Sequence, residues 1–562
     1  MKPLLTAAPI DYMIMATYFA FMLIIGFVVS RHTKTSEDFF LSGRRIPAWV
    51  TGLAFISANL GAVEVLGMAA SGSEYGMMTA HFYWVGAIPA MVFLGIFMMP
   101  FYYGSKVRSV PEYLQKRYNE PTRFINAITF AISTIVLSGV NMYAMGLVFH
   151  DLIGWNITLS IILSAGIVLI YTALGGLTSS IYNEVLQFFL IVLGLTPLII
   201  IGLIAAHGWS ALQNHVPHAL LVTSTAKKPV YMNAAQWHSF FHTWAGTATV
   251  HGNPMHITWP GIVLGLGFVL SFGYWCTDFL VVQRALAAND MNAARRTPLI
   301  AAIPKTLFPF LVILPGLLAL PLIKGLGTPN NPTLSYNNAL PLLMAHYYPA
   351  GMLGLGLTAL LASFMSGMAG NVTAFNTVFT YDLYSSYIKP DMPDEHYLKI
   401  GRLVTVVGVI VSVVTAFLAA GAPSIMDYMQ TVFGFVNAPL LATFLFGMFW
   451  KRTTPWGGFW GLIAGMLAAL THYLLTIDHV LHFSTDQSGN FWRAFVAFAV
   501  GAIVTYLVSL VTQPLPDEKM RGLVYQLTPK PESDSHLSWW RRPVVLGVLI
   551  LIFALVVNIL FW

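Results

Sequence analysis

Long apolar stretches recur along almost the whole length of this chain of 562 residues. About fourteen are long enough to cross roughly 30 Å of hydrocarbon. They lie near residues 10–30, 47–72, 79–103, 122–150, 156–176, 180–206, 258–284, 297–323, 349–386, 399–420, 424–450, 454–475, 490–512 and 541–561. A backbone in lipid must satisfy its own hydrogen bonds, and the alternating pattern of a membrane barrel is absent. The sequence therefore predicts an all-α polytopic membrane protein.

Composition supports this class, because only 9% of the residues are charged, whereas a soluble domain usually carries about 25%. The first apolar stretch is too long for a signal peptide and is expected to be a span. The single cysteine, Cys276, excludes an intrachain disulfide. Membrane lipid is therefore an expected partner of the chain, and a single copy of the chain is expected to suffice.

Basic residues alternate between the loops and predict the orientation. About 22 of the 28 Lys and Arg residues lie in the odd-numbered loops. Those loops are therefore expected to be cytoplasmic, with both termini extracytoplasmic, in a multi-pass protein of the plasma (inner) membrane. The net charge of +6 is explained by this asymmetry, so no nucleic-acid partner is expected.

Two segments outside the apolar stretches are long. Residues 207–257 form an extracellular loop that is rich in histidine. It is interpreted as a polar outer loop with short helices rather than a metal site, because neither an HExxH motif nor a Cys-His spacing is present. Residues 513–540 are interpreted as a cytoplasmic linker.

The second apolar stretch contains the sequence FISANLGAVEVLGMAA, which places an acid, Glu64, in the middle of a membrane span. An acid at that depth costs at least ~2.5 kcal/mol, which makes it a candidate functional residue. Gly61 and Gly67 lower the cost of unwinding the helix around it. The alternative is an intact helix whose small residues touch a neighbour.

Several motifs resemble one known family. They are SEDFFLSGRRIPAW before the second stretch, YTALGGLTSSIYNEVLQFFL joining the fifth and sixth, YWCTDFLVVQRALAA at the end of the seventh and FLFGMFWKRTTPWG at the end of the eleventh. Together they resemble the sodium/solute symporter family, which includes bacterial and animal sodium/glucose cotransporters. The similarity runs from about Asp11 to Trp562 and is greatest to bacterial sodium/galactose-type members.

The resemblance implies a LeuT-like core of two inverted five-helix repeats, with one extra helix before it and three after it. The expected division is an N-terminal helix and cytoplasmic loop (1–46), a first repeat (47–206), the extracellular loop (207–257), a second repeat (258–450) and three C-terminal helices with the linker (451–562). Such folds bind solute at the bilayer midplane, where discontinuous helices expose backbone groups.

The resemblance also implies a solute site. Tyr274 matches a tyrosine that stacks on a sugar ring, and Lys305 and Gln430 match hydrogen-bonding positions. Three positions depart from the family pattern, because Glu64, Tyr83 and Ser271 replace a glutamine, a glutamate and an asparagine. Glu64 and Lys305 are expected to form a buried pair. The outer-gate positions of the family fall on Met68, Phe82 and Met426, which could equally be ordinary core residues.

The resemblance implies sodium as the coupling ion, between the broken second stretch and the ninth. The positions that correspond to its ligands are Ser57, Leu60, Ser363, Ser366 and Gly367. Ser366 matches the first of two family hydroxyls, while Gly367 stands where the second should be. Sodium affinity is therefore expected to be weak, and a serine at position 367 is expected to tighten it. Glu184 matches an acidic position on the inner ion pathway; the alternative is a solvated residue at a helix start.

The expected function is therefore sodium-coupled symport of a sugar or similar small polyhydroxylated solute by alternating access. A proton-coupled or uncoupled transporter of another small organic solute is the main alternative, and a solute sensor on the same fold is a further one. An enzyme is not expected, because no convergent nucleophile and base or metal motif is found. The repeats of a channel filter or charge ring are also missing.

Overall fold

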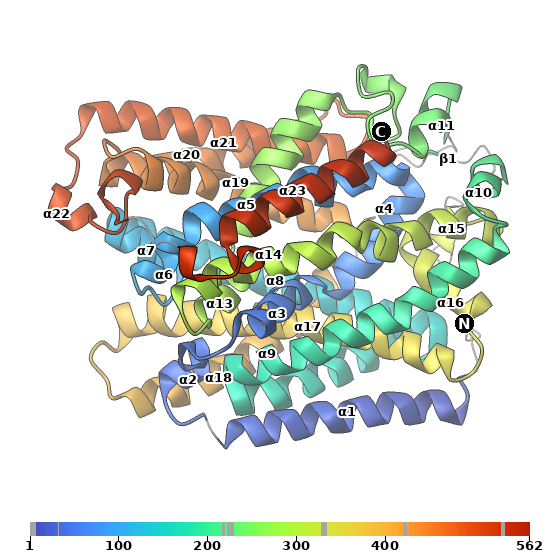
Figure 1. Ribbon diagram of the computed structural model, residues 1–562, viewed down its shortest axis with the longest axis horizontal. Helices are drawn as coiled ribbons and strands as arrows, with labels where there is room; N and C mark the ends of the chain where they lie inside the picture. The colour runs from blue at the N-terminus through green and yellow to red at the C-terminus, as the bar shows by residue number, and fades with distance from the viewer. Residues whose placement is uncertain are drawn as a thin grey trace.

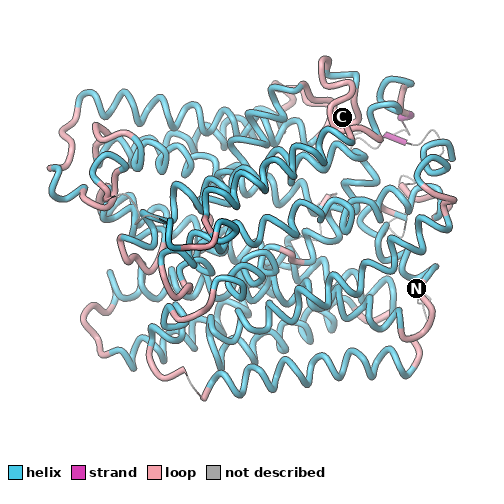
Figure 2. The backbone as a smooth tube through the Cα atoms, in the orientation of Figure 1, coloured by secondary structure: helices cyan, strands magenta, loops and turns pink. Residues whose placement is uncertain are grey.

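A computed structural model describes residues 7–31, 33–215, 220–221, 230–327, 334–419, 424–529 and 534–562. Almost all regular structure in these residues is helical, and most of the long helices run along one common direction (Figures 1 and 2). The exception is an antiparallel pair of short strands, β1 (Leu220–Leu221) and β2 (Val230–Tyr231). Apart from this pairing in the loop 207–257, the all-α prediction is confirmed.

Within several spans, 3-10 and π-helical turns join consecutive α-helices. The described residues contain the following α-helices. They are α1 (Pro9–Ser30), α2 (Ser36–Leu41), α3 (Ala48–Asn59), α4 (Met68–Tyr75), α5 (Ile88–Phe93), α6 (Met99–Gly104), α7 (Val110–Arg117), α8 (Glu120–Ile153), α9 (Ile157–Ala205), α10 (Trp209–His215), α11 (Ala234–Phe240), α12 (Ser271–Thr277), α13 (Phe279–Leu286), α14 (Met291–Phe308), α15 (Leu314–Leu322), α16 (Ala339–Tyr347), α17 (Met352–Thr377), α18 (Asp394–Ala419), α19 (Ile425–Phe449), α20 (Pro455–Ile477), α21 (Asp486–Val511), α22 (Asp517–Met520) and α23 (Pro543–Leu560).

Among the described residues, 11 helices are long and apolar enough to cross a bilayer, and up to 13 if each of two bent pairs counts as one span. A shorter apolar helix, Ile157–Ile170, lies where the fifth stretch was expected. The structure thus supports a multi-pass protein, while the total of fourteen spans stays a prediction.

Burial separates a core from a periphery. In the apolar part of Met352–Ile388, which contains α17, 89% of the residues are buried. The corresponding share is only 22% for α1, 28% for α20 and α21, and 33% for α23. These four are the helices expected outside the two repeats. Gly175–Ala205 and Asp394–Leu418, which are expected inside the repeats, are also only 33% and 39% buried, so the expected division of the chain stays a prediction.

Two spans are broken. The segments Ala48–Asn59 and Val63–Ala80 meet at 61°, and Gly261–Thr277 meets Phe279–Leu286 at 47°. At the breaks, Leu60 has a ψ of 50° and Asp278 a ψ of 121°, both outside the helical range. These spans are the first helices of the two predicted repeats. Because an unwound backbone at membrane depth is tolerated only where it lines a cavity, the two breaks locate the candidate site.

A sharp turn at Gly176 joins the fifth and sixth expected stretches within α9. Gly176 has a φ of 55° and a ψ of −144°, a conformation that side chains disfavour. A Cβ atom there would also collide with the carbonyl oxygen of Phe39 in α2. The second glycine of the GGL motif therefore allows both the turn and the close approach of α2.

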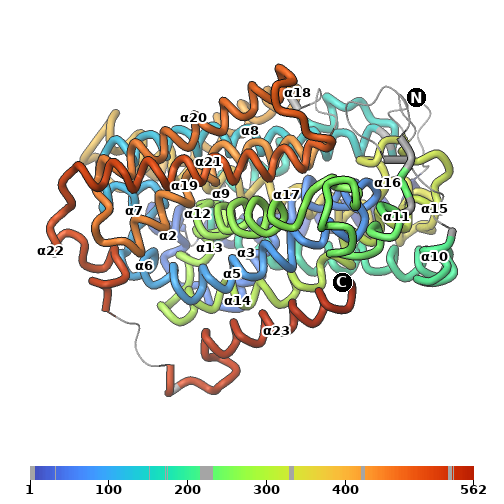
Figure 3. Tube along the Cα trace, turned by 90° about the horizontal axis from the view of Figure 1, so that it is seen from above, coloured from blue at the N-terminus to red at the C-terminus, as the bar shows by residue number. Residues whose placement is uncertain are grey.

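Both chain ends lie at the same end of the helix bundle as α10, α11 and α16 (Figure 1). The Thr243 N–H donates to the Phe561 carbonyl at 2.7 Å, which ties the 207–257 loop to the end of α23. Helices α7 and α22 lie at the opposite end, as the view from above also shows (Figure 3). Two termini on one side fit the predicted topology, and the assignment of that side as extracytoplasmic stays a prediction.

Candidate functional site

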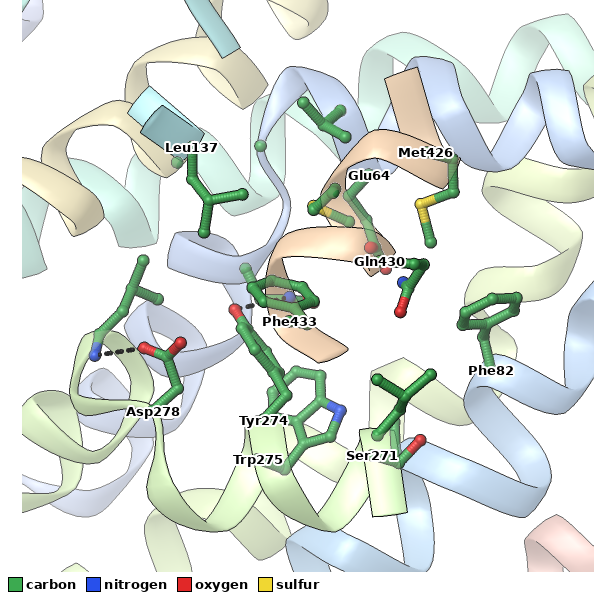
Figure 4. Close-up of a pocket in the computed structure, with 18 of the residues that line it drawn as sticks. Glu64, Phe82, Leu137, Ser271, Tyr274, Trp275, Asp278, Met426, Gln430 and Phe433 are labelled. Carbon is green, nitrogen blue, oxygen red and sulfur yellow. Dashed lines mark hydrogen bonds between the residues drawn. The ribbon is translucent and has the colours of Figure 1, made fainter. Parts of the chain in front are cut away.

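A cavity lies where the two broken spans meet α14 and α19. It is lined by every solute and gate position expected from the sequence and by one position of the ion set: Glu64, Tyr83, Ser271, Tyr274, Lys305, Gln430, Met68, Phe82, Met426 and Gly367. Figure 4 shows Phe82, Ser271, Gln430 and Met426 around one part of the open space, with Asp278 on the far side of Tyr274. The structure thus gathers residues from five distant parts of the chain.

Glu64 and Lys305 form an ion pair in the cavity wall. Lys305 Nζ lies 2.7 Å from Glu64 Oε1, and the two side chains are 2% and 8% exposed. The Tyr83 hydroxyl donates to the same carboxylate oxygen at 2.7 Å, and the Tyr83 and Trp275 rings lie 4.6 and 5.1 Å from the ammonium. The two charges therefore compensate each other, which is what allows either to remain ionised in the membrane interior.

Asn59, the last residue of α3, connects this pair to the expected stacking tyrosine. Its Oδ1 accepts a hydrogen bond from Lys305 Nζ, and its Nδ2 donates to the Tyr274 hydroxyl at 3.1 Å. Asn59 has no role predicted from the sequence, although its place two residues before Gly61 was a usable signal. Trp275, also without an expected role, packs edge-on against Tyr274 with ring centroids 5.1 Å apart.

Three polar groups on the cavity have no hydrogen bond to any described residue. They are Glu64 Oε2, the side-chain amide of Gln430 and the Ser271 hydroxyl. The Tyr274 ring, only partly buried, borders the same space and contacts Phe433 with centroids 4.8 Å apart. The cavity therefore combines an aromatic surface with donors and acceptors that a bound solute could engage.

The gate positions border the cavity from three elements. Phe82 packs against Phe491 of α21 with ring centroids 5.7 Å apart. Met426, at the start of α19, lies so close to the broken span that a Cβ on Gly67 would approach its Cβ to 3.3 Å. Met68 begins α4. These contacts are ordinary core packing, so the gate role stays a proposal.

Oxygen atoms of α17 and of the first break converge beside the cavity. The Ser57 and Ser366 hydroxyl oxygens lie 2.9 Å apart, and the Ser363 hydroxyl donates to the Leu60 carbonyl at 2.7 Å. Asn141 of α8 braces the break from the other side, where its Oδ1 accepts from the Val63 N–H at 3.4 Å. The expected ion residues thus lie together and offer the oxygen ligands that hard cations prefer.

Gly367 packs directly against the break. A Cβ on Gly367 would lie 2.6 Å from the Gly61 Cα, and a Cβ on Gly61 would lie 2.5 Å from Asn141 Oδ1. The first contact is with backbone, which would have to move, and the second is with the Asn141 side chain. The expectation that a serine at position 367 would tighten sodium binding stays a prediction, and the structure adds that such a side chain would also displace the Gly61 backbone.

Glu184 lies away from the cavity and has no exposed surface (0%), paired with Arg284 of α13 at 2.6 Å. Ser180 donates to its Oε1 at 2.6 Å, and Arg284 also reaches Thr373 of α17 at 3.3 Å. The alternative of a solvated residue at a helix start is therefore wrong. The pair joins α9, α13 and α17, and an ion-pathway role for Glu184 stays a proposal.

Known proteins resemble this chain over most of its length. The profile of the sodium:solute symporter family matches residues 39–465. The sodium/glucose cotransporter of Vibrio parahaemolyticus is 30% identical, with 82% of this chain and 84% of the relative covered. The sodium/myo-inositol cotransporter 2 of Oryctolagus cuniculus is 26% identical, with 96% of this chain and 80% of the relative covered.

Solved structures resemble the fold. A Na+-coupled sialic acid symporter in a substrate-bound outward-open state matches with a TM-score of 0.74 at 21% identity, over 90% of this chain and 99% of that one. A nucleobase-cation-symport-1 family transporter in a closed conformation matches with a TM-score of 0.51 at 10% identity, over 86% and 97%. At these identities the likeness shows the fold alone, which is the expected LeuT-like one. The family profile and the Vibrio relative together show that this chain belongs to the sodium:solute symporter family, and it is a membrane transporter rather than an enzyme.

Proposed function

We propose that this protein carries out sodium-coupled symport of a sugar or a similar small polyhydroxylated solute by alternating access. The observation that carries this proposal is the mixed chemistry of the cavity. The Tyr274 ring offers a flat apolar surface, and beside it Glu64 Oε2, Gln430 and Ser271 offer polar groups with no hydrogen bond to any described residue. A sugar ring presents the matching combination of an apolar face and a rim of hydroxyls.

The charge balance near Tyr274 favours a neutral solute. Glu64 and Lys305 neutralise each other across 2.7 Å. At this part of the wall, what remains for a ligand is hydrogen bonding, since Lys305 already donates to both Glu64 and Asn59. A solute with a full charge would have to compete with that pair. Asp278 lines the cavity on the other side of Tyr274.

The named solutes of the relatives are consistent with this class. The relatives are called cotransporters of glucose and of myo-inositol, and the structural neighbour is called a sialic acid symporter. All three solutes carry several hydroxyl groups, and glucose and myo-inositol are neutral whereas sialic acid also carries a carboxylate. Because Glu64, Tyr83 and Ser271 depart from the family pattern, the proposal names the class and not galactose.

The proposed coupling ion is sodium, held between the first break and α17. Its ligands would be the Ser366 hydroxyl and the carbonyl oxygens of Ser57, Leu60 and Ser363, while Gly367 contributes none. Glu64 follows Leu60 by only four positions on the broken span. An ion that fixes the break would therefore also fix the carboxylate in the solute cavity, which gives a physical route for coupling.

The test is uptake of labelled glucose, galactose and myo-inositol by the purified protein in liposomes. An inward sodium gradient should drive accumulation, and a choline gradient of equal ionic strength should not. Uptake that ignores sodium and follows a pH gradient would mean that the proton is the coupling ion. Solute binding without any uptake would favour a sensor. Empty liposomes control for leakage.

A further inference from the structure

A second cavity, of about 710 Å³, lies at one end of helices α18, α19, α20 and α21, apart from the solute cavity. It is at the end of the bundle that holds the two chain termini, because α21 runs from it toward α22 at the opposite end (Figure 1). Helix α19 contributes to both cavities. Met426 and Gln430 line the solute cavity, whereas the residues that follow them, Asp427 and Thr431, line this one.

Two side chains of opposite charge line this cavity without pairing with each other. Asp427 of α19 is 7% exposed and Arg493 of α21 is 4% exposed, and no ion pair within the described ranges includes either of them. Asp427 Oδ1 and Arg493 Nε have no hydrogen bond to any described residue. Because buried charges without compensation are strongly unfavourable, both groups are expected to be satisfied by an occupant of the cavity.

The Arg493 guanidinium is held in place by neutral groups. Its Nη1 donates to Asn490 Oδ1 at 2.8 Å and to Thr431 Oγ1 at 3.3 Å, and the Tyr473 ring centroid lies 4.9 Å from Cζ. None of these contacts neutralises the positive charge. A guanidinium positioned in this way favours an oxyanion, and phosphate is one of its preferred partners.

The acidic side chains favour an ammonium group in the same cavity. Asp486 adds a second carboxylate to the wall, and Glu74 of α4 is close enough to Asp427 for their charges to interact. One guanidinium is therefore opposed by more than one carboxylate. A carboxylate oxygen only accepts hydrogen bonds, so Asp427 Oδ1 needs a donor such as a primary ammonium. A quaternary ammonium has no N–H to donate.

The position of the cavity favours a lipid as the source of these groups. Leu418 at the end of α18 is 69% exposed and Ile477 at the end of α20 is 52% exposed, and both line the cavity. Only 39% and 28% of the apolar parts of these two helices are buried, so both helices are expected to contact acyl chains. The ends of membrane spans lie at the depth of the lipid head groups. A head group in the cavity would therefore have its chains beside α18 and α20.

We propose that this cavity binds the ethanolamine phosphate head group of a phospholipid, with the phosphate at Arg493 and the primary ammonium at Asp427. This goes beyond the proposed function and holds whichever solute and ion are carried. Soluble ethanolamine phosphate has the same chemistry, and the experiment separates the two sources. Because α19 lines both cavities, a bound head group would also stabilise the helix that carries Met426 and Gln430.

The test is the binding of single phospholipids to the purified full-length protein in detergent, measured by native mass spectrometry. Phosphatidylethanolamine is compared with phosphatidylcholine and phosphatidylglycerol that have the same acyl chains. The ethanolamine lipid is expected to bind about tenfold more tightly than either of the others, the effect of a hydrogen bond to a charged group. Its N-methyl and N,N-dimethyl derivatives should bind progressively more weakly, because each methyl group removes an N–H donor.

The decisive variant is Asp427→Asn, which removes the charge and keeps the size of the side chain. It should abolish the preference for the ethanolamine lipid over the choline lipid. Arg493→Lys should weaken the binding of all three lipids, since each carries a phosphate and lysine lacks the planar fork of arginine. Asp478→Asn is the matched control, because Asp478 is an exposed carboxylate at the same end of α20 and is not among the residues that line the cavity. It should leave the preference unchanged.

Equal binding of the three lipids by the native protein would overturn the lipid assignment, and so would an undiminished preference in D427N. Soluble ethanolamine phosphate is titrated separately. If it binds to the native protein and not to D427N, while no lipid is preferred, the lipid assignment is wrong and the site takes a soluble ligand. If D427N is not recovered in folded form, the methylated lipids decide, because they remove the N–H donors without changing the protein. Solute uptake is not the readout, so failure here leaves the proposed symport standing.

Discussion

The Lys305 ammonium of α14 lies 2.7 Å from the Glu64 carboxylate, on the segment that follows the first break. The two residues are 241 positions apart and belong to different predicted repeats. Their ion pair therefore forms part of the cavity wall and links one predicted repeat to the other. The arrangement also means that neither residue can be changed alone without leaving the other charge uncompensated.

Glu64→Gln is expected to destabilise the protein, because it leaves the Lys305 ammonium buried without a carboxylate. Removing one partner of a buried pair typically costs about 3–5 kcal/mol, whereas removing both can be nearly neutral. The double variant Glu64→Gln/Lys305→Met should therefore unfold at a higher temperature than either single variant. Thermal unfolding of the purified proteins in detergent measures this. Glu395→Gln, which breaks an exposed pair with Lys399, is the control and should change little.

The same variants test the solute site. Glu64→Gln restores the commoner family residue and should change which sugars are taken up, since the cavity loses an acceptor-only group. An unchanged solute profile in both E64Q and the double variant would place the solute elsewhere. If the double variant unfolds at as low a temperature as the less stable single variant, Glu64 and Lys305 do not compensate each other's charge.

Tyr274→Phe is expected to keep most solute uptake, and Tyr274→Ala to abolish it. Phenylalanine retains the ring and its contact with Phe433, and loses only the hydrogen bond from Asn59. Alanine removes the flat surface that the sugar is proposed to contact. Uptake rates at saturating sodium measure the difference, and full uptake by the alanine variant would end the stacking assignment.

Hydropathy and motif resemblance predicted the spans and much of the cavity. The spans follow from composition, because lipid leaves the backbone few alternatives to a helix. Tyr274, Lys305 and Gln430 were identified by motif position, and they line one cavity in the structure. Glu64 was identified as a candidate functional residue without the family resemblance, because an acid in the middle of a membrane span is rare and costly.

Apart from the Glu64–Lys305 pair, the sequence did not predict which residues of distant segments contact each other. The burial of Glu184 depends on Arg284, which lies 100 positions away. The constraint on Gly367 depends on the opposing Gly61 backbone. A local pattern contains no information about which residue faces which across two helices. The solvated alternative for Glu184 was therefore wrong, and the prediction for Gly367 left out its packing against Gly61.

Glu184→Gln is expected to lower the thermal stability of the protein, because Arg284 would be left as a fully buried charge. Glu112→Gln is a suitable control, since Glu112 pairs with Lys116 within one helical turn near the surface. Unfolding temperatures in detergent compare the two. If Glu184→Gln unfolds like the native protein but slows sodium release in liposomes, the ion-pathway role proposed for Glu184 is favoured over a structural one.

Ser366→Ala is expected to weaken the sodium dependence of uptake without preventing folding. It removes the main hydroxyl available to the proposed ion. The loss of one ligand plausibly costs on the order of 1–3 kcal/mol, or roughly a tenfold to hundredfold change in affinity. Uptake titrated with sodium at constant ionic strength gives the half-saturating concentration. An unchanged value would remove Ser366 from the ligand set.

Gly367→Ser tests whether sodium affinity is limited by the missing hydroxyl at this position or by the close contact between the two helices. Since a Cβ there would lie 2.6 Å from the Gly61 Cα, we expect the variant to be less stable than the native protein and its sodium dependence to be no tighter. Gly370→Ala is the matched control on the same helix, because a Cβ at Gly370 meets its nearest neighbours at 3.4 Å and needs little adjustment. Unfolding temperature and sodium titration are measured on both variants. A stable Gly367→Ser protein with tighter sodium binding would show that the break at Gly61 can move to admit a second hydroxyl, and the weak affinity would then be due to the absent ligand alone.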